Sequence, residues 1–307
     1  MNNGKAAARD RMPAKIRHGW IVALLLVLCG TGVFAQTEAD FEVRLTSDGE
    51  GLVILAYTGR AAQIQIPAVI RGIPVREIGD GEDPVTGPEV TGIVIPPGVT
   101  KINSQAFAHC SSLTTVTLPA DLQTIGGYAF VRCTSLTAVI LPAGLQTIGE
   151  GTFDDCFSLT TVTFPAGLQI IGDYAFVRCT SLTAVTLPAG LQTIGEYAFE
   201  SCTSLTAVTL PAGLQTIGEY AFAHCSSLAA VALPAGLQTI GEGAFLACSS
   251  LTVVTYPDTI QITGLPWWGT AEVFRDCPRL SPASRAAIKK LDEIAEANRE
   301  RAEPGKE

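Results

Sequence analysis

The chain has 307 residues, of which 47% are hydrophobic and 16% are charged. It is too apolar for a disordered protein, and it is poorer in charge than ordinary domains, which carry about 25% charged residues. Its formal charge of −9 argues against a nucleic-acid-binding protein, because such proteins present a basic surface. A length near 300 usually indicates two globular domains, but an internal repeat removes that expectation.

The first 35 residues have the pattern of a secretory signal peptide. Five basic residues precede the short apolar run Ile21–Leu28, and Val33-Phe34-Ala35 fits a cleavage site. The apolar run is too short for a membrane span of roughly 20 residues. An uncleaved anchor and lipidation of Cys29 stay open as alternatives. We expect export, with Gln36 as the first mature residue and no stable membrane span afterwards. The mature chain then has 15 basic and 28 acidic residues, a charge of −13.

Residues 36–89 are expected to form an N-terminal cap. Phe41–Leu45 and Leu52–Tyr57 alternate apolar and polar residues around a Gly-containing turn, which predicts a β-hairpin. Ile64-Gln65-Ile66-Pro67 then resembles the strands of the later repeat, and 29 residues separate Ile66 from Ile95. This spacing predicts a first, divergent coil with an insertion.

Residues 90–280 contain a 23-residue repeat, illustrated by LQTIGEYAFESCTSLTAVTLPAG at 191–213. A period of this length predicts stacked coils, none of which can bury its apolar side alone. Within one coil, Val139 and Leu141 share a strand face and Pro142 ends the strand. Ala129–Cys133 is expected to form a short helical or 3₁₀ turn. The fold class is therefore a β-rich α/β solenoid with a parallel sheet on one face.

Stacking places equivalent residues of successive coils side by side at roughly 4.8 Å. One column is aromatic and buried, and another consists of cysteines. Parallel Cβ vectors at this spacing disfavour disulfides, which need converging Cβ atoms about 3.8 Å apart. Reduced core thiols are favoured, with disulfides and a metal site as alternatives. The phenylalanines are Phe107, Phe130, Phe153, Phe176, Phe199, Phe222 and Phe245, and the cysteines are Cys110, Cys133, Cys156, Cys179, Cys202, Cys225 and Cys248.

Residues 281–307 are expected to form a C-terminal capping helix and a polar tail. Ser281 and Pro282 suit the start of the helix. Ile288 and Leu291 lie on one apolar stripe, which can cover the open end of the solenoid.

Two features are candidate ligand-binding sites. The first is the outward-facing threonine column of the predicted strands, for which strand propensity is the simpler explanation and ice binding a remote one. The second is the tryptophan pair in the insertion before the last cysteine, which could equally seal the end of the solenoid. The candidate residues are Thr117, Thr163, Thr186, Thr209, Thr255, Trp267 and Trp268.

The remaining polar residues suggest neither catalysis nor a cofactor. A column of carboxylates that includes Glu150 and Asp173 lacks the loops of a calcium site, and identical carboxylates do not provide a distinct acid and base. We therefore expect a protein that is not an enzyme and has no cofactor and no metal site. The pair of residues before each cysteine varies between coils, through drift or through partner specificity.

The pattern CxxLxxVxLPxxLxxIGxxAF, seen as CTSLTAVTLPAGLQTIGEYAF over 202–222, resembles the treponemal-type or BspA-like leucine-rich repeat. The resemblance implies a solenoid of secreted or surface proteins, several of which adhere to host proteins, and it implies no catalytic residues. We expect an exported surface adhesin that binds a protein or glycan ligand, with host extracellular matrix among its candidates. A structural component of the periplasm or cell envelope is the alternative.

Overall fold

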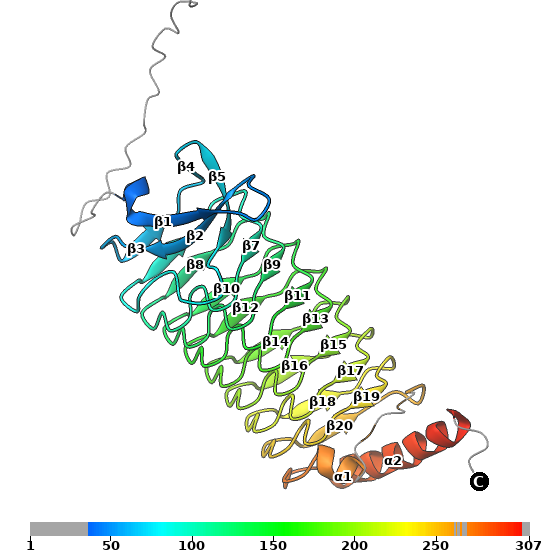
Figure 1. The fold of residues 1–307 in the computed structure, drawn as a ribbon. Helices are drawn as coiled ribbons and strands as arrows, with labels where there is room; N and C mark the ends of the chain where they lie inside the picture. Colours follow the sequence, from blue (N-terminus) through cyan, green and yellow to red (C-terminus); the bar gives the residue numbers. More distant parts are fainter. Residues whose placement is uncertain (1–35, 261, 263–264, 266–268, 303–307) are drawn as a thin grey trace, which may run out of the picture. The chain divides into compact units, whose positions relative to one another are not determined.

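The computed structural model describes residues 36–260, 262, 265 and 269–302. The predicted signal peptide and both tryptophans lie outside these residues. The described chain forms a β-solenoid in which each coil contributes two short strands and a segment of turns (Figure 1). Both kinds of strand pair in parallel with the equivalent strand of the next coil, except between β8 and β10, between β12 and β14, and between β9 and β11. Between the regular coils the register shift is the repeat length, as in Val139 opposite Val162.

The first ladder is formed by three-residue strands with an inward-facing valine or isoleucine at the centre, most of them close to Ala/Thr-Val-Thr in sequence. Its members are β3 (Gln63–Gln65), β6 (Gly92–Val94), β8 (Thr115–Thr117), β10 (Ala138–Ile140), β12 (Thr161–Thr163), β14 (Ala184–Thr186), β16 (Ala207–Thr209), β18 (Ala230–Ala232) and β20 (Val253–Thr255).

The second ladder is formed by the strands of the return path, most of them Thr-Ile, and each places its last isoleucine in the core. Its members are β5 (Ile73–Ile78), β7 (Lys101–Ile102), β9 (Thr124–Ile125), β11 (Thr147–Ile148), β13 (Ile170–Ile171), β15 (Thr193–Ile194), β17 (Thr216–Ile217) and β19 (Thr239–Ile240). The sequence predicted a sheet on one face only, so this second ladder is an addition to the predicted fold.

The third side of each coil is a run of turns, and the expectation of a helical or 3₁₀ turn there is wrong. Tyr128 and Arg132 both have φ of 58°, in the left-handed region, which interrupts any helix. The intervening N–H of Phe130 donates to the carbonyl of Thr152 in the next coil at 2.9 Å. The next N–H, of Val131, donates within its own coil to the carbonyl of Tyr128 at 3.1 Å. The backbone of this side therefore alternates between bonds to the next coil and single turns, and no continuous helix forms.

The core is the predicted spine of aromatic side chains. The seven phenylalanines from Phe107 to Phe245 are fully buried. Neighbouring rings stack with centroids 5.2–5.5 Å apart, and Phe274 of the C-terminal region extends the column by one ring at 5.3 Å. Adjacent coils are therefore held together by ring-to-ring packing as well as by backbone hydrogen bonds.

The N-terminal end contains the predicted β-hairpin. A short 3₁₀ turn, η1 (Glu38–Asp40), leads into β1 (Phe41–Leu45), which pairs antiparallel with β2 (Leu52–Tyr57). The strand β2 then pairs in parallel with β5, and the short strand β4 (Val69–Ile70) folds back on β5. The side-chain amide of Gln36 bonds the main chain of Gln63 and Gln65, so it occupies the edge of the first ladder where another strand would pair.

The C-terminal end is covered by the helices α1 (Thr270–Val273) and α2 (Pro282–Ala302). Leu291 of α2 is fully buried, as the apolar stripe predicts. The hydroxyl of Ser284 accepts from the N–H of Val254 and donates to the carbonyl of Thr252, both at 3.0 Å, which satisfies the open edge of β20. Among the described residues, no helix combines the length and the apolar character that a membrane crossing requires.

Candidate ligand-binding face

The outward surface of the first ladder from β8 to β20 is the strand face. In each of these strands the central valine points inward and the two flanking residues are exposed. None of the side chains in these strands is charged. The structure places the predicted residues Thr117, Thr163, Thr186, Thr209 and Thr255 in one exposed column of this face. Trp267 and Trp268 are outside the described residues, so their role stays a prediction.

Ile140 is the largest departure from threonine in this column. Its side chain is 72% exposed, which is the highest value among the large hydrophobic residues of the described chain. Ala232 is the other departure, and it lies in the same column on β18. An exposed isoleucine in a threonine column costs solubility without improving the core, so Ile140 is a candidate contact residue that the sequence analysis did not select.

A second threonine column, directly before the strands, has a structural role. The hydroxyl of Thr160 donates to the carbonyl of Thr137 in the preceding coil at 2.9 Å. Thr114, Thr137, Thr206 and Thr252 make the same contact one coil back. These hydroxyls are occupied, so the exposed column with Thr117 is the better candidate for ligand contact.

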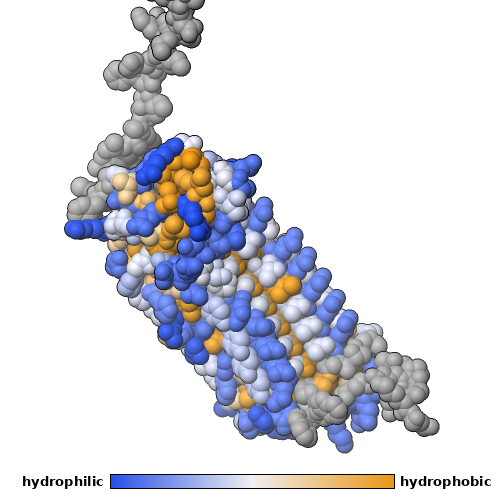
Figure 2. Space-filling view, in the orientation of Figure 1, coloured by the Kyte–Doolittle hydropathy of each residue, from blue (hydrophilic) through white to orange (hydrophobic). Residues whose placement is uncertain are grey.

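A groove of about 510 Å³ lies on the strand face between β8 and β10. Ile140, Leu141 and Pro142 form one side of it, and Val116 and Leu118 lie on the other. The space-filling view shows hydrophobic residues in rows that run from coil to coil along the length of the solenoid, between rows of hydrophilic residues (Figure 2). The complete lining is Thr114, Thr115, Val116, Thr117, Leu118, Ala120, Thr137, Ala138, Ile140, Leu141, Pro142 and Ala143.

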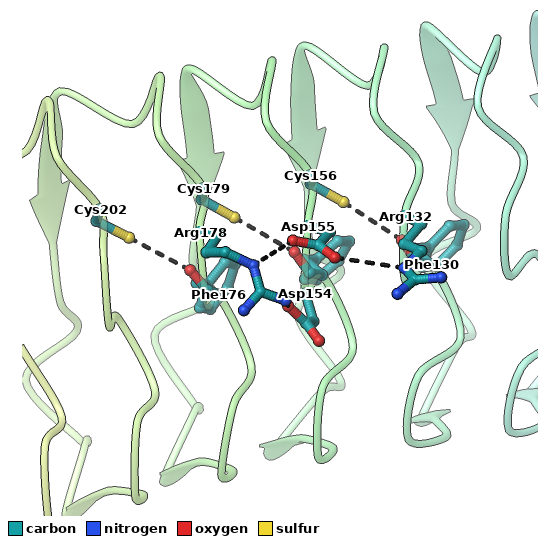
Figure 3. A network of polar contacts seen from close by, with 10 residues as sticks. Phe130, Arg132, Asp154, Asp155, Cys156, Phe176, Arg178, Cys179 and Cys202 are labelled. Atoms are coloured by element: carbon teal, nitrogen blue, oxygen red, sulfur yellow. Dashed lines mark hydrogen bonds and ion pairs between the residues drawn. The ribbon is translucent and has the colours of Figure 1, made fainter.

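The cysteine column is free of disulfides among the described residues, and Cys277 extends it to eight buried thiols. Each thiol from Cys133 to Cys277 donates to the carbonyl of a core phenylalanine in the preceding coil, at 3.2–3.3 Å (Figure 3). Burial raises the pKa of the Cys202 thiol to about 12 and that of Cys277 to about 11. The thiols from Cys133 to Cys277 are therefore neutral donors inside the core.

No group of three or more potential ligand side chains gathers at a metal-binding distance in the part of the chain that the structure describes. The carboxylate column lies on the turn side, away from the strand face. There the hydroxyl of Tyr128 donates to Glu150, and that of Tyr220 donates to Glu242 at 3.0 Å. The hydrogen bond to Glu150 raises the pKa of Tyr128 to about 12. This column therefore supports the turns by hydrogen bonding between coils.

The variable pair before each cysteine contains an ion-pair network that the sequence analysis missed. Asp155 lies between the guanidinium groups of Arg132 and Arg178, which come from the coils on either side (Figure 3). Arg178 also contacts Asp154 at 3.3 Å. The hydrogen bond from Arg178 holds the pKa of the Asp155 carboxyl below its usual range. Opposite charges at a spacing of 23 residues were the sequence signal for this network.

Comparison with known proteins agrees with this architecture. The family model described as BspA type leucine rich repeat region (6 copies) matches residues 86–180 and 146–281. No curated protein matches the chain by sequence. Among solved structures, a leucine-rich repeat protein of T. pallidum is 28% identical, with a TM-score of 0.51, and the match covers 83% of this chain and 95% of that one. A leucine rich cell surface protein from Faecalibacterium prausnitzii is 23% identical, with coverages of 84% and 98% and a TM-score of 0.37.

The family model spans well over half of the chain, and the stacked coils and the phenylalanine and cysteine columns recur throughout that span. The chain therefore belongs to the BspA-type leucine-rich repeat family.

Proposed function

We propose that this protein is an exported adhesin, not an enzyme, that binds a protein or glycan ligand through the strand face. The observation that carries the proposal is the uncharged, exposed surface of β8 to β20 on a chain with a formal charge of −9. The same two outward positions recur in seven strands, so the face can repeat one contact many times.

The strand face is both rigid and uncharged. The strand face is backed by a buried column that includes Val139 and Val185, so a ligand meets a surface that is already ordered. Preorganisation reduces the entropy lost on binding. Repeated weak contacts on such a face add up through avidity. A face without charge selects ligands by shape and apolar or hydroxyl contacts, which suits protein loops and glycans better than nucleic acid.

The test uses the purified chain and immobilised extracellular matrix proteins and glycans. The variant Thr186→Asp/Thr209→Asp places two carboxylates on the strand face. The matched control Gln192→Asp/Gln215→Asp places the same charges on exposed positions of the same coils, just before the second ladder. We expect the threonine variant to lose at least tenfold in affinity and the glutamine variant to bind as the parent does. Equal loss in both variants, or in neither, would argue against the strand face as the binding site.

Export is tested separately, in cells that produce the full chain. Protease treatment of intact cells should remove the protein if it is displayed on the surface. Survival of the protein in intact cells, together with release from the periplasm, would favour the alternative of a structural component of the envelope.

A further inference from the structure

Both ladders are interrupted at the same junction between coils. The strands β8 and β9 belong to coil 113–135, and β10 and β11 belong to coil 136–158. Neither β8 with β10 nor β9 with β11 forms a ladder pair. The first ladder is interrupted again between β12 and β14, but there the second ladder continues, so in the described chain only the junction of β8–β9 with β10–β11 interrupts both ladders. At the end of β10, the N–H of Leu141 donates to the carbonyl of Thr163 at 3.0 Å; within the described chain the equivalent bond is absent at Leu118, as it is at Phe164, Leu187 and Leu210. We call this junction the seam.

The turn side of the seam stays closed. The N–H of Tyr128 donates to the carbonyl of Glu150 at 2.7 Å, and the N–H of Arg132 donates to that of Asp154 at 2.7 Å. The Arg132–Asp155 ion pair crosses the same junction. The rings of Phe130 and Phe153 remain stacked, at 5.5 Å, the widest spacing in the column. On the strand side, the N–H and the hydroxyl of Thr137 reach the carbonyl of Thr114 at 3.4 Å, directly before the strands, but the strands themselves do not pair. The two coils are therefore joined more fully along the turns than along the strands, and the groove lies on the strand side.

The groove has the chemistry of an apolar binding site. Its volume of about 510 Å³ falls within the range of ligand pockets, roughly 300–1,000 Å³. Its lining has no ionisable side chain. The hydroxyls of Thr114 and Thr137 already donate to backbone carbonyls, so Thr115 and Thr117 supply the hydroxyls available to a ligand. A charged group placed here would lose its hydration without gaining a partner, whereas an apolar group would bury itself against Ile140 and Leu118.

We infer that the seam groove receives an uncharged apolar anchor, one or two neighbouring hydrophobic side chains on an exposed segment of a partner protein. The inference deepens the proposed function, on which it rests, by assigning the site and the chemistry of a protein ligand. The occupant follows from charge and size: the groove is neutral on an acidic chain, and it has room for a few side chains. Ile140, exposed beside the groove, contributes apolar area that a bound side chain would cover.

The probes are two acetylated nine-residue Gly/Ser peptides, one with Phe-Leu at its centre and the other with Ser-Ser. Methyl NMR of the purified chain reports where each peptide binds. We expect the Phe-Leu peptide to shift the methyl signals of Ile140, Leu118 and Leu141 saturably and the Ser-Ser peptide to leave them unchanged. The variant Ile140→Asp should weaken binding at least tenfold. The control Ala232→Asp has the same charge at the equivalent exposed position of β18, outside the groove, and should bind like the parent.

The inference would be overturned by the absence of saturable shifts, by shifts spread evenly over the coils, or by equal loss in the two aspartate variants. Shifts of the same methyl groups on concentrating the protein alone would identify a second copy of the chain as the occupant. Shifts with free decyl maltoside but not with the peptide would identify a small amphiphile. In a further outcome, the Phe-Leu peptide fails to bind while a matrix ligand still binds the strand face and loses affinity in Thr186→Asp/Thr209→Asp. That result would refute the inference about the groove and leave the proposed function standing.

Discussion

The substitution Phe176→Ala tests whether the aromatic column holds the solenoid together. Phe176 is fully buried, and its ring stacks between Phe153 at 5.4 Å and Phe199 at 5.2 Å. Phe164 packs against the same ring edge-on at 5.8 Å. Truncating a buried phenylalanine to alanine costs about 3–5 kcal/mol, because the apolar transfer free energy is lost and a cavity remains. Contacts with three rings place the expected loss in the upper part of that range.

The matched control is Phe157→Ala, one coil earlier, where the side chain is 41% exposed. This substitution should reduce the free energy of unfolding by about 1 kcal/mol or less, because the side chain is already partly in water. Phe176→Leu keeps most of the volume and should lose about 1.5 kcal/mol. Urea unfolding followed by far-ultraviolet circular dichroism measures all three changes, with the slope m reporting whether the whole solenoid still unfolds together. Similar losses for Phe176→Ala and Phe157→Ala would refute the idea that the stacked rings stabilise the fold.

Four further predictions concern pH, charge, repeat number and export. Only the unfolded chain ionises Cys202 between its ordinary pKa near 9 and its raised pKa of about 12. The free energy of unfolding should therefore fall by up to about 1.4 kcal/mol per pH unit for each such thiol as the pH rises. When the free energy of urea unfolding is measured between pH 9 and 11, its decrease with pH should be smaller in Cys202→Ala, by the contribution of that one thiol. Asp155→Asn should reduce the free energy of unfolding by about 1 kcal/mol at pH 7. The lowered pKa of Asp155 stabilises the fold only while the carboxyl is ionised. Urea unfolding in acid should therefore show the parent and the variant becoming equally stable once this carboxyl is protonated. Deleting residues 191–213 restores every column across the join, so circular dichroism should show a folded chain, with a smaller m. Protein sequencing of the exported form should give Gln36 as the first residue, and a lipidated Cys29 would contradict this.

The repeat alone was sufficient to predict the columns, because a constant spacing of 23 residues brings equivalent side chains together whatever path the coil takes. The rings of Phe199 and Phe222, for example, stack at 5.3 Å. The path itself was harder to predict. Gly151 and Gly243 replace the tyrosine of the other coils and share its positive φ. These glycines signalled a left-handed position, and the apolar pattern of Ala129–Phe130 suggested a helical turn instead.

The interruption of the ladders could not be predicted, because the sequences on the two sides of the seam are nearly the same. Thr115–Thr117 and Ala138–Ile140 both contain β-branched residues that suit a strand, and the same sequence Ala-Val followed by a β-branched residue pairs normally in β14 and β16. The Arg–Asp network depended on alternating charges at 132, 155 and 178, and it could have been found by comparing columns instead of single coils.

Specificity in a repeat protein must come from its departures from the repeat. Identical coils present the same contact many times, which increases avidity but does not distinguish one ligand from another. Coil 136–158, on one side of the seam, has several of these departures: Ile140 in the threonine column, the charged pair Asp154-Asp155, and the exposed Phe157. The same junction has the interrupted ladders and the groove. If the coils on both sides supply a uniform adhesive surface, then this junction is the part of the face that can select among ligands, and exchanging it for a regular coil should broaden binding without abolishing it.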